Sequence, residues 1–298
     1  MPPNDSKPLR KNPRTLKRAS LCTIHEVESW QLENQYLIGH YRTASNSYRS
    51  SLASLCYLHN QTSNVYTHLV GTGLFLAWAL HTYNDMLQRY PTSEFYDFLV
   101  FGVFFACALS CFGFSALFHL FMNHSAKVNQ IWLLFDLYGV FALIIATIFS
   151  GTYYAFYCER FWWKTYSSGI IAITFACALF CSKPQFRHPK WRNVRAVLFI
   201  SIGFYGVLPM THLAEKWGRP KANEIIAWNL MFWEGLSYGF GAAVYAFRIP
   251  ERWQPGRFDI WGASHQIFHV CAVLGAALHY QGLIKGFDYS HSPNSRQC

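Results

Sequence analysis

Apolar and polar stretches alternate along most of the chain. From Asn64 onward, mostly apolar runs of about 20 residues, the length that a helix needs to cross the hydrocarbon core of a bilayer, are separated by short polar gaps. The gaps are rich in Pro, Gly, Asn and charged residues, as loops are. The pattern predicts an all-α, polytopic membrane protein with seven transmembrane helices. We place the helices at residues 64–86, 95–121, 128–156, 162–181, 192–213, 223–247 and 261–285.

The N-terminal part of the chain does not follow this pattern. Residues 1–20 hold six Lys or Arg and four Pro, which predicts a disordered basic tail. Trp30, Tyr36, Leu37 and Ile38 then indicate either a short amphipathic helix or a segment packed on the membrane surface. We expect no secretory signal peptide, because no apolar core of the needed length precedes the first predicted helix. The predicted domains are a basic cytosolic tail with a short membrane-proximal helix at 1–63, a seven-helix transmembrane domain at 64–286 and a short C-terminal tail at 287–298.

Composition supports lipid as the main solvent. Aromatic residues make up 18% of the chain and charged residues only 13%, against a usual charged share of about 25%. The formal net charge of +10 raises the question of nucleic acid, but Lys and Arg cluster in the tail and the loops, which suits anionic lipid head groups. We therefore expect no nucleic-acid partner. The nine Cys residues form no CxxC pair and most lie in apolar runs, so we expect neither a disulfide framework nor a cysteine metal site.

The distribution of Lys and Arg also predicts the orientation of the helices. The loops and tail on the N-terminal side hold 17 of these residues and the opposite side holds 8. Positive residues accumulate on the cytosolic side of membrane proteins. We therefore expect a cytosolic N-terminus and a C-terminus on the far side, in a multi-pass protein of the plasma membrane or the endoplasmic reticulum. This orientation is opposite to that of G-protein-coupled receptors.

Ionisable side chains inside the predicted helices are the candidate functional residues, because such groups are costly at membrane depth. They are His68, His119, Asp136, His212, Glu234, His265, His269 and His279. His265 and His269 are four residues apart and share one helix face. In a seven-span chain, His119 near the end of the second helix and Asp136 near the start of the third lie at the same cytosolic depth as this pair.

A layer of three histidines and an aspartate indicates a zinc site. Three neutral imidazoles leave one position of a tetrahedral Zn²⁺ open, as in catalytic sites, and water in that position has a pKa of about 7. Asp136 is either a fourth ligand or the base that holds this water and takes its proton. Ser115, four residues before His119, can donate a hydrogen bond to a polarised substrate carbonyl or steady the site.

The other polar residues also have structural interpretations. His68, His212 and His279 are more simply hydrogen-bonded packing residues, and Glu234 can pair with a histidine or the backbone of a neighbouring helix. Ser115 can bond back to the carbonyl four residues earlier. The layer of His119, Asp136, His265 and His269 is harder to explain without a metal, since each member would need its own partner.

Four stretches together resemble the progestin and adipoQ receptor family, which includes the adiponectin receptors and the haemolysin III proteins. They are residues 59–69, 115–119 with the following His124-Ser125, 135–139, and 248–269. The resemblance extends from Trp30 to about Tyr280. The last stretch is most similar to the eukaryotic adiponectin-receptor branch. Fungal members linked to zinc and sterol homeostasis are also similar.

The resemblance implies seven helices, a cytosolic N-terminus and Zn²⁺ bound by His119, His265 and His269. It also implies that Asp136 holds the zinc through a water, with Ser115 nearby, and that the activity is hydrolysis of the amide of a ceramide-like lipid. Two departures stand out. The family usually has Glu where this chain has Gln61, and its Asp-Tyr-x-Gly motif is replaced by Asp136-Leu137-Tyr138-Gly139.

Three functions remain open at this point. The first is a zinc-dependent lipid amide hydrolase, which couples receptor-type signalling or lipid and zinc homeostasis to cleavage of a ceramide-like membrane lipid. The second is a receptor whose zinc is purely structural, and which binds an extracellular protein or a steroid-like ligand. The third, a zinc transporter, is disfavoured because His212, Glu234 and His279 outline no path across the bilayer.

Overall fold

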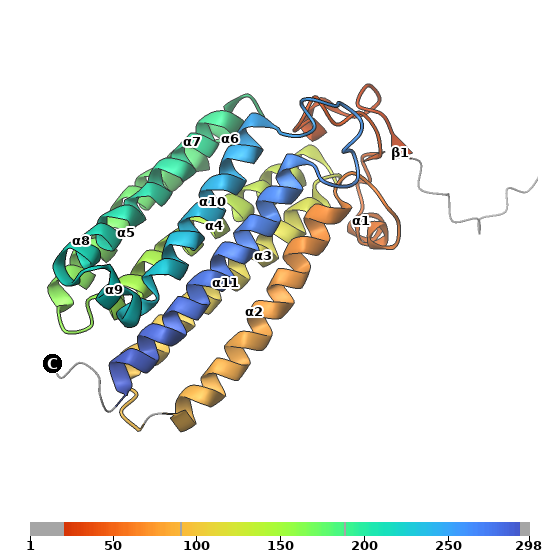
Figure 1. The fold of residues 1–298 in the computed structure, drawn as a ribbon. Coiled ribbons are helices and arrows are strands. Elements are labelled where there is room, and N and C mark those ends of the chain that lie inside the picture. Colours follow the sequence, from red (N-terminus) through yellow and green to blue (C-terminus); the bar gives the residue numbers. More distant parts are fainter. Residues whose placement is uncertain (1–20, 90, 188, 293–298) are drawn as a thin grey trace, which may run out of the picture.

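The computed structural model describes residues 21–89, 91–187 and 189–292, so the predicted basic tail at 1–20 lies outside the described residues. Long helices run roughly side by side in one bundle, with the N-terminal segment at one end and the C-terminus at the other (Figure 1). The long helices are α2 Thr62–Arg89, α3 Phe95–Phe121, α4 Ala126–Ala155, α5 Arg160–Ser182, α10 Trp228–Phe247 and α11 Ser264–His291. A further helical column consists of α7 Arg192–Gly203, the 3₁₀ turn η4 Phe204–Gly206 and α8 Val207–Trp217.

The outer surface of the bundle suits lipid. Five described helical segments, α3, α4, α5, residues 192–217 and α11, are long and apolar enough to cross a membrane. Large apolar side chains also point outward from the other long helices, as Leu80 on α2 and Phe240 on α10 do, with exposed fractions of 62% and 61%. The polar residues Asn64, Thr67 and His68 lower the hydropathy of α2. The fold is therefore that of an all-α membrane protein, and the count of seven spans stays a prediction.

The interior of the bundle is packed with aromatic side chains. Phe75 of α2, Phe104 and Phe112 of α3, Tyr154 of α4 and Phe287 of α11 belong to one buried cluster. Helix α11 packs against α2, α4, α9 and α10 and is thus surrounded by other helices. Its central place fixes the position of the two histidines at its start.

Several predicted helix bounds differ from the structure. The predicted helix 223–247 is two helices, α9 Arg219–Ile226 and α10, separated by Ala227 in the left-handed region with φ 48° and ψ 56°. Helix α11 begins three residues later than predicted and continues to His291, into the stretch that was expected to be a C-terminal tail. The predicted helix 192–213 continues to Trp217, where Gly218 with φ 74° ends it.

The N-terminal segment covers one end of the bundle without the amphipathic helix that Trp30–Ile38 could have formed. Its elements are β1 Leu21–Cys22, η1 Ser29–Gln31, β2 Tyr41–Arg42, α1 Tyr48–Ala53 and η2 Ser54–Cys56, and β1 pairs antiparallel with β2. Of residues 30–38, only the first two are helical, in η1. The short elements α6 Pro184–Arg187 and η3 Pro189–Trp191 lie in the loop before α7.

Two buried carboxylates fasten the N-terminal segment to the loop before α11. Glu251, which is fully buried, accepts hydrogen bonds from Asn34 Nδ2 at 2.8 Å and from both the backbone N–H, at 2.8 Å, and the hydroxyl of Ser264. Asp259 accepts from the backbone N–H groups of Ile38 at 2.9 Å and Gly39 at 2.6 Å. Glu251 also places a negative charge at the N-terminus of α11, where the helix dipole favours it.

We expect Glu251→Ala to destabilise the protein by roughly 3 kcal/mol or more, because it leaves buried donors of Asn34 and Ser264 without an acceptor. The melting temperature of the detergent-purified protein should fall by roughly 6 °C or more. Glu224→Ala is the matched control, since Glu224 is exposed and pairs with Lys221 on the same helix. Equal melting temperatures for both variants would contradict the anchoring role of Glu251.

Cysteine was predicted to form no disulfide, and this was wrong at one position. Cys158, in the loop between α4 and α5, is disulfide-bonded. Disulfides persist in oxidising compartments. The loop lies at the opposite end of the bundle from the N-terminal segment (Figure 1).

Candidate metal centre

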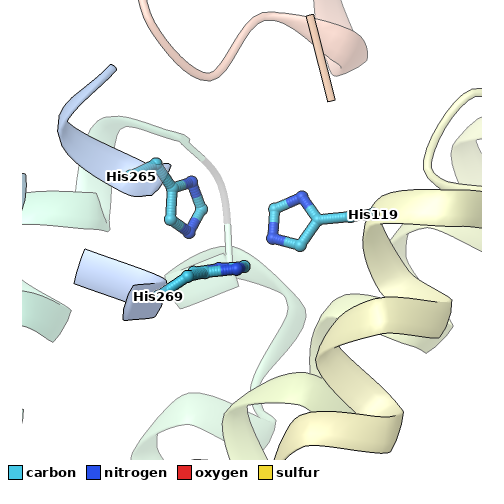
Figure 2. Close-up of side chains that lie close together, drawn as sticks. All are labelled: His119, His265 and His269. Atoms are coloured by element: carbon cyan, nitrogen blue, oxygen red, sulfur yellow. The ribbon is translucent and has the colours of Figure 1, made fainter. Parts of the chain in front are cut away.

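Three histidines from two helices meet at the end of the bundle that the N-terminal segment covers. His119 lies in the last turn of α3, and His265 and His269 lie in the first two turns of α11. One ring nitrogen of each lies within 4.8 Å of those of the other two. Figure 2 shows the three rings facing one common point between the two helices. The structure brings His119 together with His265 and His269, the residues that helix geometry and the order of the spans placed at one depth.

The arrangement of the rings fits one metal ion. The ring centres of the three imidazoles are 4.8, 4.8 and 4.9 Å apart, and each pair meets edge to face at 66–88°. Three imidazoles on one tetrahedral zinc ion have ring centres about 5 Å apart. His119 Nε2 is buried and has no hydrogen-bond partner among the described residues. A buried acceptor without a partner is costly, and a metal ion would satisfy it.

Gln61, just before α2, and Asn64, in its first turn, supply the partners that orient two of the rings. His119 Nδ1 lies 2.8 Å from Gln61 Oε1, and His269 Nδ1 lies 3.2 Å from the backbone carbonyl oxygen of Asn64. Both partners are acceptor oxygens. Gln61 Oε1 also accepts a hydrogen bond from Asn64 Nδ2 at 2.7 Å, which assigns the amide oxygen of Gln61 to this position. Each Nδ1 therefore carries the proton and each Nε2 keeps its lone pair for a metal, the arrangement typical of metal-binding histidines.

The sequence offered only a weak signal for these partners. Gln61 stood out only as a departure from the family pattern, and Asn64 was not singled out for chemistry. Both residues are buried at the start of α2. The depth of each residue in the membrane could be predicted, but the lateral packing of α2 against α3 and α11 could not. The contacts of Gln61 and Asn64 with the histidines were therefore missed.

Removal of the Gln61 side-chain acceptor should weaken metal binding without abolishing it. In Gln61→Leu, His119 loses the partner that fixes its tautomer, so we expect zinc affinity to fall about 10- to 100-fold. Competition with a calibrated chelator measures this change. Gln88→Leu removes an exposed glutamine at the other end of α2 and should leave affinity unchanged. Unaltered affinity in Gln61→Leu would remove Gln61 from the support of the site.

Arg42 ties the N-terminal segment to the helix end that carries His119. Its guanidinium donates to the backbone carbonyl oxygens of His119 at 2.6 Å and Leu120 at 2.9 Å, and to Ser54 Oγ at 2.7 Å. Burial lowers the pKa of Arg42 to about 10, so the side chain stays charged at neutral pH. A positive charge at the C-terminus of α3 is favoured by the helix dipole. Burial, with Arg42 nearby, also lowers the pKa of His59 to about 3.

Asp136 and Ser115 contact each other beside the histidine cluster. The side chain of Ser115, one turn before His119 on α3, lies close enough to the carboxyl group of Asp136 on α4 to interact with it. Asp136 does not belong to the group whose donor atoms gather within 4.8 Å. The geometry thus favours the prediction that Asp136 acts at one remove from a metal over the prediction that it is a fourth ligand.

His68 was interpreted as a hydrogen-bonded packing residue, and the structure places it differently. Its ring stacks in parallel on His269, with ring centres 3.6 Å apart and planes 5° apart. The side chain is buried, and neither ring nitrogen has a hydrogen-bond partner within the described part of the chain. By stacking on the face of the His269 ring, His68 fixes the plane of that ring.

The remaining candidate residues, His212, Glu234 and His279, are hydrogen-bonded to neighbouring helices, as the packing interpretation predicted. His279 Nδ1 lies 2.9 Å from a carboxylate oxygen of Glu234, and its Nε2 lies 2.9 Å from Ser150 Oγ. His212 Nδ1 lies 2.9 Å from the hydroxyl of Tyr166. These residues satisfy one another and do not join the histidine cluster.

Comparison with known proteins gives a consistent set of matches. The sequence profile described as Haemolysin-III related matches residues 56–280. The chain is 34% identical to "Adiponectin receptor protein" of Drosophila melanogaster, over 88% of this chain and 59% of that protein. It is 34% identical to "Heptahelical transmembrane protein 1" of Arabidopsis thaliana, over 93% of this chain and 84% of the relative. It is 30% identical to "ADIPOR-like receptor IZH2" of Saccharomyces cerevisiae, over 91% and 85%.

Proposed function

The chain belongs to the Haemolysin-III related family of adiponectin-receptor-like, multi-pass membrane proteins, and on that premise we propose that it is a metal-dependent hydrolase of a membrane lipid amide. The observation that carries the proposal is the cluster of His119, His265 and His269 at the end of the bundle that the N-terminal segment covers. Three imidazoles fill three positions of a tetrahedral ion and leave one for a reactant, which is the composition of catalytic zinc sites. Zn²⁺ suits imidazole ligands and is the proposed ion.

The residues around the cluster have distinct proposed roles. Zinc would supply Lewis-acid activation of water and of the substrate carbonyl. The three histidines hold the ion, and Gln61 and the Asn64 carbonyl keep the donor nitrogens directed at it. Asp136 accepts a proton from the attacking water and passes it to the leaving amine nitrogen. Ser115 holds the Asp136 carboxyl group in place and can donate a hydrogen bond to the developing oxyanion.

The proposed substrate is a ceramide-like lipid, which hydrolysis with one water converts into a fatty acid and a sphingoid amine. Two considerations support this class. The cluster lies within helices that face lipid on their outer surface, so a membrane lipid reaches it more readily than a soluble substrate. The amide chemistry is what the family resemblance implies. The printed names of two relatives describe them as receptors, and we propose that hydrolysis here is coupled to a ligand on the outer side or to lipid and zinc homeostasis.

A second function is supported by the position of the cluster between α3 and α11. A metal held there would join the two helices, as a structural ion does in a receptor without hydrolase activity. The two functions differ in one measurable respect, because only a hydrolase needs the open fourth position and a base.

The test is hydrolysis by the purified full-length chain in phosphatidylcholine nanodiscs that contain an N-acyl sphingoid lipid. The proposal expects release of fatty acid that stops after chelation and returns when Zn²⁺ is added back. A sample with about one zinc ion per chain and no fatty-acid release would favour the structural metal. A preparation that releases fatty acid at an undiminished rate after complete removal of the metal would refute the metal-dependent mechanism.

A further inference from the structure

A small cavity lined mostly by polar residues lies between the N-terminal segment and the histidine cluster. It has a volume of about 20 Å³. Its lining includes Gln31 and Tyr41 from the N-terminal segment, Asn60 and Asn64 beside the start of α2, Arg192 of α7 and His265. A second cavity of about 10 Å³ shares Gln31, Tyr41 and Asn60 with the first. We name the first cavity, defined by these lining residues, the polar chamber.

Four buried polar atoms of the chamber lining have no hydrogen-bond partner in the described chain. They are Gln31 Oε1, Asn60 Nδ2, Asn64 Oδ1 and Arg192 Nη1. Their residues are only 2–5% exposed. Buried polar atoms are almost always hydrogen-bonded, so four unpaired atoms around one small cavity indicate a ligand that bonds to them.

The donor and acceptor types of these atoms identify the chemistry of the ligand. Gln31 Nε2 donates to the carbonyl oxygen of Arg42, and Asn64 Nδ2 donates to Gln61, so the free atom of each amide is an acceptor oxygen. Arg192 can only donate. Two acceptors and two donors match a hydroxyl-bearing molecule such as water, which donates two hydrogen bonds and accepts two.

The charged groups in the lining and the size of the chamber narrow the choice of ligand further. Glu33, which also lines the chamber, lies close enough to Arg192 and Arg195 to interact with both. An anion in the chamber would lie beside the Glu33 carboxyl group as well as the Arg192 guanidinium, so the lining does not select for an anion. A cavity needs about 10–15 Å³ to hold one water, so the chamber has room for a water or a terminal hydroxyl but not for a sugar or a phosphate.

We propose that the polar chamber is a binding site for a neutral hydroxyl group and that it holds water beside the histidine cluster. The chamber lies between the N-terminal segment and His265, so water held there lies next to the proposed metal site. Its role in supplying hydrolysis rests on the proposed function, whereas its occupancy does not. A hydroxyl on the head group of a lipid has the same chemistry and is the other source of an occupant.

Radiolytic footprinting in H₂¹⁸O tests occupancy without turnover, because radicals formed from bound water label adjacent buried side chains. The full-length chain in phosphatidylcholine nanodiscs should be labelled at Leu37 and Tyr41, which line the chamber and are buried, and not at Phe104 in the apolar core. Asn60→Leu removes a donor and should reduce the label at both positions about fivefold. Asn60→Ser keeps a hydroxyl and leaves space, so it should retain the label. Asn84→Leu, on the exposed side of α2, is the matched control.

Addition of lipid separates the two sources. An N-acyl sphingoid lipid with a free terminal hydroxyl should protect Leu37 and Tyr41 if its head group displaces the water, and its O-methyl analogue should not. An unchanged label with either lipid identifies water as the occupant. The proposal is overturned if wild type is unlabelled at these positions, if Asn60→Leu is labelled as strongly as wild type, or if both lipids protect equally. Since footprinting needs no hydrolysis, an unoccupied chamber and a lack of hydrolase activity give different results.

Discussion

Replacement of His265 with alanine removes the metal from the protein. Loss of a partner that only orients a ligand weakens metal affinity about 10- to 100-fold, so loss of one of three ligands should exceed the upper end of that range. Purified wild-type chain should carry about one zinc ion and the His265→Ala chain close to none. The measurement is elemental analysis of both proteins after the same dialysis.

Stability provides a second readout for the same variant. A ligand that binds only the folded state stabilises it by mass action. Added zinc should therefore raise the melting temperature of chelator-treated wild type and leave that of His265→Ala unchanged. His81→Ala is the matched control, because His81 is an exposed histidine on α2 away from the cluster. A His265→Ala protein that retains wild-type zinc content would exclude His265 as a ligand.

Replacement of Asp136 with asparagine separates catalysis from metal binding. Asn keeps the size and the acceptor oxygen that Ser115 contacts, but it cannot take a proton from water at neutral pH. Positioned acids and bases contribute about 10²- to 10⁴-fold to rate, so kcat should fall by that factor while zinc content stays at the wild-type level. Fatty-acid release and elemental analysis on one preparation measure both quantities.

The control for this variant is Asp85→Asn. Asp85 pairs with Arg89 at the opposite end of α2 and should tolerate the change with full activity. If Asp136→Asn kept wild-type turnover, Asp136 would have no part in proton transfer. If it lost both turnover and zinc, Asp136 would instead be needed to build the metal site.

Sequence patterns predicted which histidines come together better than they predicted the residues around them. The four-residue spacing of His265 and His269 and the depth of His119 both follow from helical geometry and the order of the spans, and the structure brings these residues together. The position of a residue along the membrane normal follows from its place within its own helix. Which helices are neighbours depends on packing of the whole bundle, and so the contacts of Gln61 and Asn64 with the histidines could not be predicted.

The long-range contacts of the N-terminal segment could not be predicted from the sequence either. Asn34 and Glu251 are 217 residues apart, and nothing in the composition of either stretch links them. The segment was expected to be a helix or to lie on the membrane, and instead its polar residues bond to the loop before α11. The break at Ala227 had no warning either, because a left-handed alanine lacks the glycine that usually marks such a position.

X-ray absorption at the zinc K-edge of the purified wild-type chain tests the central claim most directly, because it reports the ligands themselves. We expect a four-ligand shell of nitrogen and oxygen at about 2.0–2.1 Å, with the outer-shell scattering of three imidazoles. A shell that contains sulfur at about 2.3 Å, or a protein that binds no zinc under any loading condition, would contradict it.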